Sequence, residues 1–145
     1  MADHTIVGHK IVAGVEFPWP HIPEVVRSHH ERADGSGYPD HLRGDEIPLT
    51  VRVIGLADSF DAMTSDRSYR HSLSLGETLT QIVRATPLRY DFEAVQALLV
   101  QLRRDSAGAQ TFLDPHIPMT VGPRDLDQLA ADLNFRINQG RVYSA

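Results

Sequence analysis

Apolar side chains recur every three or four residues along most of the chain, a spacing that is typical of amphipathic α-helices. No segment shows the alternation of β-branched residues that favours a strand. We therefore predict an all-α fold. The expected helices cover residues 3–15, 22–32, 48–63, 75–85, 92–102 and 126–140.

Three of the expected helix starts carry recognisable end signals. Ser74 and Glu77 form a capping box, in which each side chain satisfies a free amide at the helix start. Asp91 is placed to cap the next helix, and Pro48 suits the first turn of the helix that follows it. These signals make the starts of these helices better defined than their ends.

The helix predicted after Pro48 is apolar around almost its whole perimeter, which predicts that it is buried. Two carboxylates, Asp58 and Asp61, interrupt it. A buried carboxylate is costly unless it is paired or coordinated to a metal. Two explanations for Asp58 therefore stay open: an ion pair with Arg52 or Arg67, and a metal site.

Composition narrows the range of functions. The 145 residues include 14 Lys+Arg and 19 Asp+Glu, so the formal net charge is −5, and there is no cysteine. The acidic balance disfavours binding to DNA, and the lack of cysteine excludes disulfides, thiolate zinc sites and a cysteine nucleophile. No apolar run approaches the ~20 residues that span a bilayer, so we expect a cytoplasmic protein without membrane insertion.

Histidine is concentrated near the N-terminus, where His29 and His30 are adjacent. Neighbouring residues on a regular helix point about 100° apart, so both reach one centre only near a helix end, unless they flank two ions. A chance pair on a solvated helix face is the alternative. If the pair binds metal together with a carboxylate, the sulfur-free ligands suit Zn, Fe, Mn or Ni.

The chain is irregular after this pair. The loop contains Asp34, Gly35, Gly37, Tyr38 and Pro39. Its glycines either make simple tight turns or allow the backbone to approach a ligand closely, and Tyr38 offers a ring and a hydroxyl.

Two arginines follow the helix that carries Asp58. The guanidinium groups of Arg67 and Arg70 match phosphate oxygens, although ordinary surface charge explains such a pair equally well.

These segments together resemble a known family. Residues 29–39 read His-His-Glu-Arg-Ala-Asp-Gly-Ser-Gly-Tyr-Pro and resemble the signature His-His-Glu-x-x-Asp-Gly-x-Gly-Tyr-Pro of the HD-GYP family. That family is a branch of the HD metal-dependent phosphohydrolases and hydrolyses cyclic di-GMP. Residues 4–8 resemble the family's upstream His-x-x-x-Gly segment, and residues 52–70 resemble the helix and loop after the signature. The resemblance covers residues 3–103 and implies a helical HD-domain-like bundle.

The resemblance also implies roles for individual residues. The positions of family metal ligands fall on His4, His29, His30 and Asp58. The phosphate-contacting positions fall on Arg67 and Arg70, and the signature tyrosine falls on Tyr38. The expected chemistry is hydrolysis of a phosphodiester that divalent metal ions polarise while arginines stabilise the developing charge.

The N-terminal side departs from the family pattern. The sequence contains no His-Asp dipeptide, the pair that gives the family its name. We therefore assign no catalytic residue and expect an N-terminally truncated bundle with an extra C-terminal helix. The expected divisions are an HD-GYP-like portion at 1–104, a connector at 105–123, and a C-terminal helix and tail at 124–145.

Two functions stay open at this point. The first is a phosphodiesterase acting on cyclic di-GMP, either truncated or completed by a second polypeptide. The alternative is a catalytically incomplete remnant that binds a nucleotide or a partner, or a helical interaction domain that binds neither metal nor nucleotide. The resemblance implies contact between the Gly-Tyr-Pro loop and diguanylate cyclase domains, and the missing helices predict self-association into a homo-oligomer.

Overall fold

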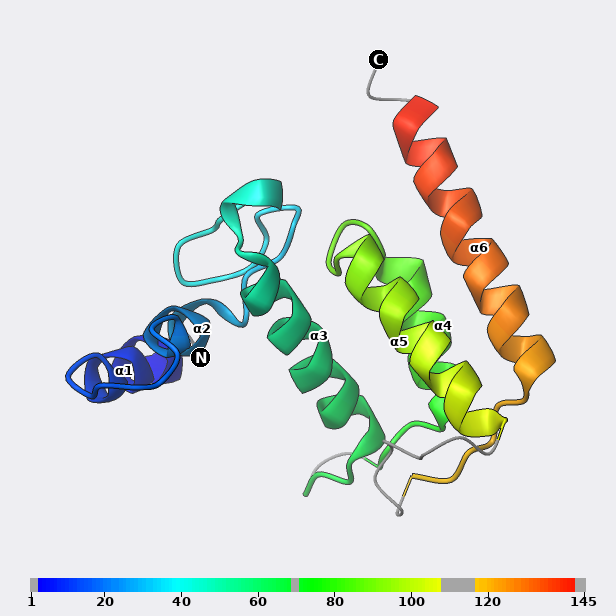
Figure 1. Ribbon diagram of the computed structural model, residues 1–145, viewed down its shortest axis with the longest axis horizontal. Helices are drawn as coiled ribbons and strands as arrows, with labels where there is room; N and C mark the ends of the chain where they lie inside the picture. Colours follow the sequence, from blue (N-terminus) through cyan, green and yellow to red (C-terminus); the bar gives the residue numbers. More distant parts are fainter. Residues whose placement is uncertain (1–2, 69–70, 108–116, 143–145) are drawn as a thin grey trace. The chain divides into compact units, whose positions relative to one another are not determined.

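The computed structural model describes residues 3–68, 71–107 and 117–142 (Figure 1). Within these ranges it contains helices and loops, and the prediction of an all-α fold is confirmed. The α-helices are α1 (Asp3–Val12), α2 (Ile22–Ser28), α3 (Leu49–Thr64), α4 (Leu75–Ala85), α5 (Phe92–Ser106) and α6 (Pro123–Val142), with a 3₁₀ helix η1 (Gly44–Glu46). The chain divides into two compact units, and the boundary falls inside α3 after Asp58.

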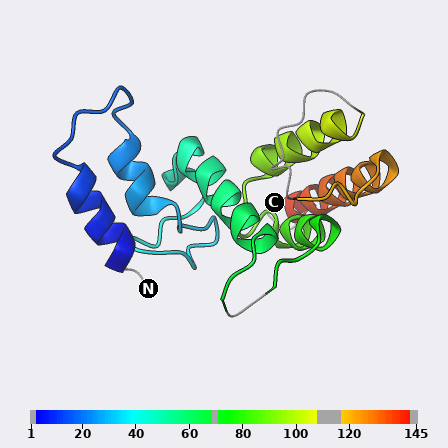
Figure 2. The same cartoon turned by 90° about the horizontal axis from the view of Figure 1, so that it is seen from below.

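The first unit is built on an antiparallel hairpin of α1 and α2 (Figure 2). The two helices approach closely at Gly8, where an added Cβ would lie 2.9 Å from a methyl group of Val26. Thr5, one turn before Gly8, is fully buried. The small residue at position 8 therefore sets the distance between the helices that carry the histidines.

The end of α2 differs from the prediction. We expected this helix to reach Arg32, and it ends at Ser28. The backbone then tightens, and the amide of Glu31 donates to the carbonyl of Ser28 at 2.8 Å. Beyond this helix end, the Glu31 carboxylate accepts amides of the following loop.

The prediction that α3 is buried on all sides is wrong. Val51 and Leu56 are buried, but Val53 and Ile54 are 43% and 45% exposed. Apolar residues all around a helix do not identify the sides that neighbouring elements cover. Among the described residues of the first unit, packing reaches only part of the α3 surface.

The second unit consists of the C-terminal end of α3 together with α4, α5 and α6, and α6 lies alongside α4 and α5 (Figure 1). Its fully buried side chains include Leu79, Ile82, Val95, Leu102 and Leu133. These positions recur at helical spacing, so one face of each helix supplies the core.

The predicted helix starts in this unit are confirmed. The Ser74 hydroxyl accepts the amide of Glu77, whose carboxylate accepts the amide of Ser74, and Asp91 caps α5 through the amide of Ala94. The last helix is longer than predicted, beginning at Pro123 and continuing past residue 140. Proline suits a first helical turn because it lacks the amide that would be unpaired there.

Candidate metal centre

Three histidines from separate places in the first unit gather at one point. His4 comes from α1, His29 from the end of α2, and His30 from the residue after it. A ring nitrogen of each lies within 4.8 Å of a ring nitrogen of the other two. The closest approach joins Nε2 of His4 and Nε2 of His30 at 3.1 Å.

This spacing matches what a metal ion requires. Two nitrogens that bind one ion at about 2.1 Å are about 3.0–3.4 Å apart in octahedral or tetrahedral geometry. The 3.1 Å separation between His4 and His30 falls in this range. The His4–His30 pair therefore suits a divalent ion, and His29 offers a third nitrogen within 4.8 Å of both.

The tautomer of His29 is fixed by the helix that carries it. Its Nδ1 lies 3.0 Å from the carbonyl oxygen of Val26 and 3.3 Å from that of Val25. Because carbonyl oxygens only accept hydrogen bonds, the Nδ1 atom carries the proton and donates it. The Nε2 lone pair is left free to bind a metal, which is the usual arrangement around metal-ligating histidines.

Electrostatics favour the neutral, metal-binding form of His30. Burial lowers its pKa below the ordinary value of 6.5, and the neighbouring His29 lowers it further. The carboxylate of Asp58 acts in the opposite direction and raises the pKa of His30. A histidine that stays neutral at lower pH competes less with protons for the ion.

The two adjacent histidines converge because the helix ends between them. His29 is the C-terminal cap of α2, and His30 lies outside the helix. The requirement derived from the sequence, that the pair lie near a helix end, is met. A chance pair spread over one solvated helix face does not describe this geometry, since the ring centroids of His29 and His30 are 4.2 Å apart.

Gly55 of α3 also positions this site, and the sequence interpretation overlooked it. An added Cβ at this position would lie 2.7 Å from the carbonyl oxygen of His29. Real Cβ atoms do not approach so closely, so only glycine lets α3 pack against the backbone of this ligand. A glycine inside an otherwise apolar helix was the available signal.

The signature loop folds back onto the histidines. The ring of Tyr38 packs on that of His30 with centroids 4.8 Å apart, and burial raises the pKa of its hydroxyl above 10.0. At Gly37 an added Cβ would lie 2.5 Å from backbone atoms of residues 30–32, so the loop touches the ligand segment directly. Gly35 has a φ of +76°, and the side chain of Asp34 accepts the amide of Ser36 at 2.8 Å.

Glu31 is a second residue that the sequence interpretation passed over. Its side chain is buried, with 8% exposure. Its carboxylate accepts the backbone amides of Asp40, His41 and Leu42 at 2.6, 3.1 and 3.0 Å. The loop is thereby tied to the ligand segment at both of its ends.

Of the three predicted site residues that follow the signature loop, Asp58 lies in the same unit as the histidines. Asp58 is exposed and lies close enough to influence the pKa of His30, but it is not within the 4.8 Å group. Arg67 is exposed and belongs to the second unit. Arg70 lies outside the described residues. The roles of these three residues stay predictions.

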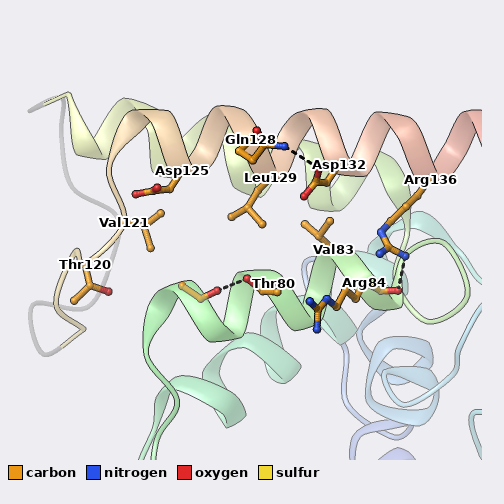
Figure 3. A pocket seen from close by; sticks show the side chains of 11 residues that line it. Thr80, Val83, Arg84, Thr120, Val121, Asp125, Gln128, Leu129, Asp132 and Arg136 are labelled. Carbon is orange, nitrogen blue, oxygen red and sulfur yellow. Dashed lines mark hydrogen bonds between the residues drawn. The ribbon is translucent and has the colours of Figure 1, made fainter.

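The second unit has a cavity of its own between α4 and α6 (Figure 3). It measures about 480 Å³, and several of its polar side chains make hydrogen bonds within its walls. Arg136 donates to the carbonyl of Arg84 at 3.5 Å, and Gln128 donates to Asp132 at 3.0 Å. Among the described residues, only the histidine cluster brings three candidate metal ligands together, so we take it as the candidate site. No described helix combines the length and apolar character needed to cross a membrane.

Comparison with known proteins gives consistent results. A sequence model described as "HD domain" matches residues 1–94. A cyclic di-GMP phosphodiesterase of Thermotoga maritima is 39% identical over 100 residues, 68% of this chain and 27% of that protein. The cyclic di-GMP phosphodiesterase response regulator RpfG of Xanthomonas campestris is 35% identical over 100 residues, 68% of this chain and 26% of that protein.

A shorter match has higher identity. The 3'3'-cGAMP-specific phosphodiesterase 1 of Vibrio cholerae is 54% identical over 52 residues, 36% of this chain and 12% of that protein. The chain spans about a quarter of the length of the first two relatives.

Proposed function

The chain belongs to the HD domain family, and on that premise we propose that it forms part of a metal-dependent phosphodiesterase that hydrolyses a cyclic dinucleotide. The observation that carries this proposal is the convergence of His4, His29 and His30, with a nitrogen separation that suits a bound ion. The activities named for its relatives favour this function over a remnant that only binds nucleotide.

In this proposal the three histidines hold the ion, and the carbonyls of α2 keep the Nε2 atom of His29 available to it. When bound, a divalent ion supplies Lewis-acid polarisation of the phosphodiester. The ring of Tyr38 lines the proposed substrate site beside His30. Arg67 and Arg70 bind phosphate oxygens. Asp58, whose charge acts on His30, completes the proposed set of metal ligands.

The proposed substrate is cyclic di-GMP. The relatives include phosphodiesterases named for cyclic di-GMP and for 3'3'-cGAMP, two ligands that share a ring closed by two phosphodiesters. The ligand chemistry of three imidazoles is compatible with Fe, Mn, Zn or Ni. Contact of the Gly-Tyr-Pro loop with diguanylate cyclase domains and homo-oligomer formation belong to the same proposal.

The test combines metal binding with turnover. Protein purified without chelators is analysed for bound metal, and hydrolysis of cyclic di-GMP is followed with Mn²⁺ or Fe²⁺ supplied. We expect His29→Ala to abolish both signals, whereas the control His21→Ala retains them because that side chain is 69% exposed and is paired with Glu24. Metal content that is the same in wild type and His29→Ala would refute the site assignment.

A further inference from the structure

One carboxylate accepts three consecutive backbone amides of the loop that follows the two histidines. Glu31 directly follows the two adjacent histidines, and its buried side chain accepts the amides of three consecutive residues, Asp40, His41 and Leu42. Both carboxylate oxygens take part, with Oε1 accepting two amides and Oε2 accepting one. Hydrogen bonds to a charged group contribute more than those between neutral groups.

The backbone of the loop is shaped for this contact. His41 has a φ of +56°, a left-handed conformation that residues other than glycine rarely adopt. Such a residue between neighbours of ordinary conformation turns successive amides toward one side, forming a concave site for an anion. In this chain the anion is the side chain of Glu31, which offsets the strain at His41.

The same loop carries the ring that packs on the metal cluster. Between the two anchored segments lies Tyr38, whose amide donates to the carbonyl of His30 at 3.3 Å and whose ring lies on the His30 ring. A second tie comes from Arg27, which donates two hydrogen bonds of 2.7 Å to Asp40. Glu31 therefore acts on Tyr38 through the loop backbone, and Tyr38 in turn contacts His30 through its amide and its ring.

We propose that Glu31 is a positioning residue for Tyr38, the side chain that lines the proposed substrate site beside His30. Glu31 holds the 34–42 loop closed so that Tyr38 stays packed on His30. Its carboxylate is occupied by three amides and does not serve as a metal ligand. The part of this inference that concerns cyclic di-GMP rests on the proposed function, whereas the closure of the loop does not.

The test uses Glu31→Gln, which keeps the shape of the side chain but places an NH₂ group against one of the three amides. The matched control is Glu46→Gln, because Glu46 is an exposed carboxylate in the same loop region that accepts one amide, that of Arg43. Hydrogen exchange at residues 40–42 is measured first in the wild-type protein. We expect slow exchange there, accelerated at least about 10-fold by Glu31→Gln and unchanged by Glu46→Gln.

Two further measurements separate a positioning role from a general loss of structure. The affinity for Co²⁺, followed by its absorption spectrum, should stay within about 2-fold of wild type in Glu31→Gln, because the histidines do not depend on the carboxylate. Binding of cyclic di-GMP should weaken about 10-fold when Glu31→Gln is introduced into the wild-type protein. When Glu31→Gln is introduced into the Tyr38→Ala variant, binding should weaken less than about 2-fold relative to Tyr38→Ala alone. Such non-additivity is expected only if Glu31 acts through Tyr38.

Each outcome decides a separate point. Wild-type exchange at 40–42 as fast as in an unstructured peptide would overturn the closure, and this measurement needs no variant that must fold. A fall in Co²⁺ affinity as large as that in His29→Ala would overturn the separation of Glu31 from the metal. If wild-type protein binds Co²⁺ but not cyclic di-GMP, the proposed function fails, and the exchange and Co²⁺ results still decide whether Glu31 closes the loop.

Discussion

Replacing Gly55 with alanine tests whether α3 positions the ligand His29. The added Cβ would lie 2.7 Å from the carbonyl oxygen of His29, whereas ordinary contacts begin near 3.4 Å. Either α3 or the backbone at His29 must therefore move by more than half an ångström. The carbonyl belongs to the same residue as the imidazole of the candidate ligand His29, so the displacement should reach the proposed metal site.

The expected magnitude follows from two opposing terms. Replacing glycine with alanine inside a helix stabilises the helix by about 1 kcal/mol, because alanine loses less backbone entropy on folding. Overpacking against backbone costs about 1–3 kcal/mol. We expect Gly55→Ala to lose about 1 kcal/mol of unfolding free energy, and Co²⁺ affinity to fall about 10–100-fold, as when groups that orient ligands are disturbed.

Gly76→Ala in α4 provides the matched control, because an added Cβ there would meet only a methyl group of Val121 at 3.6 Å. Urea denaturation of both variants compares the same chemical change with and without the clash. Co²⁺ titration reports on the site. If Gly55→Ala gained as much stability as Gly76→Ala and bound Co²⁺ like wild type, the inferred role of this close approach would be refuted.

Three further predictions concern other contacts. A hydrogen bond from Arg27 lowers the pKa of Asp40 below 3.8, so this ion pair stabilises the fold above about pH 4 and its contribution is lost on acidification. Between about pH 6 and pH 2, the unfolding free energy measured by urea denaturation should fall by about 0.5–1 kcal/mol more in wild type than in Asp40→Asn. Ser74→Ala removes the capping box with Glu77 and should cost about 1 kcal/mol, with a smaller loss contradicting the cap's role. Gly37→Ala should cost about 1–3 kcal/mol and accelerate proteolysis of the loop, and an intact, equally stable loop would contradict the close approach.

The helices were predictable where a local signal marked them. Ser74 with Glu77 and Asp91 are side chains whose hydrogen bonds lie within one turn, so the sequence alone indicates where α4 and α5 begin. The end of α2 was not predictable in this way. The backbone leaves the helix after Ser28, and Glu31 then accepts amides about ten residues further along the chain, contacts that periodicity does not contain.

The prediction that α3 is buried on all sides failed for a related reason. The apolar perimeter indicates that many of its faces can pack, but exposure depends on which elements lie against them. Val51 is 1% exposed, whereas Val53, two residues later, is 43% exposed. Both are valines on the same helix, so only the tertiary arrangement distinguishes them.

The candidate site was predictable as a set of residue types, and its geometry was not. The resemblance identified His4, His29 and His30, which the structure brings together. The glycine that fits against His29 acts through the absence of a side chain. Such a role is visible only when the neighbouring backbone is known, which is why Gly55 was overlooked.

The ties between Glu31 and residues 40–42 also bear on how this loop can vary. Doubling a flexible loop costs only about 0.6 kcal/mol of closure entropy, but segment 32–39 is held at both ends and also packs along its length, since Gly37 and Tyr38 touch residues 30–32. The segment is therefore constrained in length as well as in sequence. Insertions there are expected to displace Tyr38 from the His30 ring while the histidines and their supporting helices remain in place.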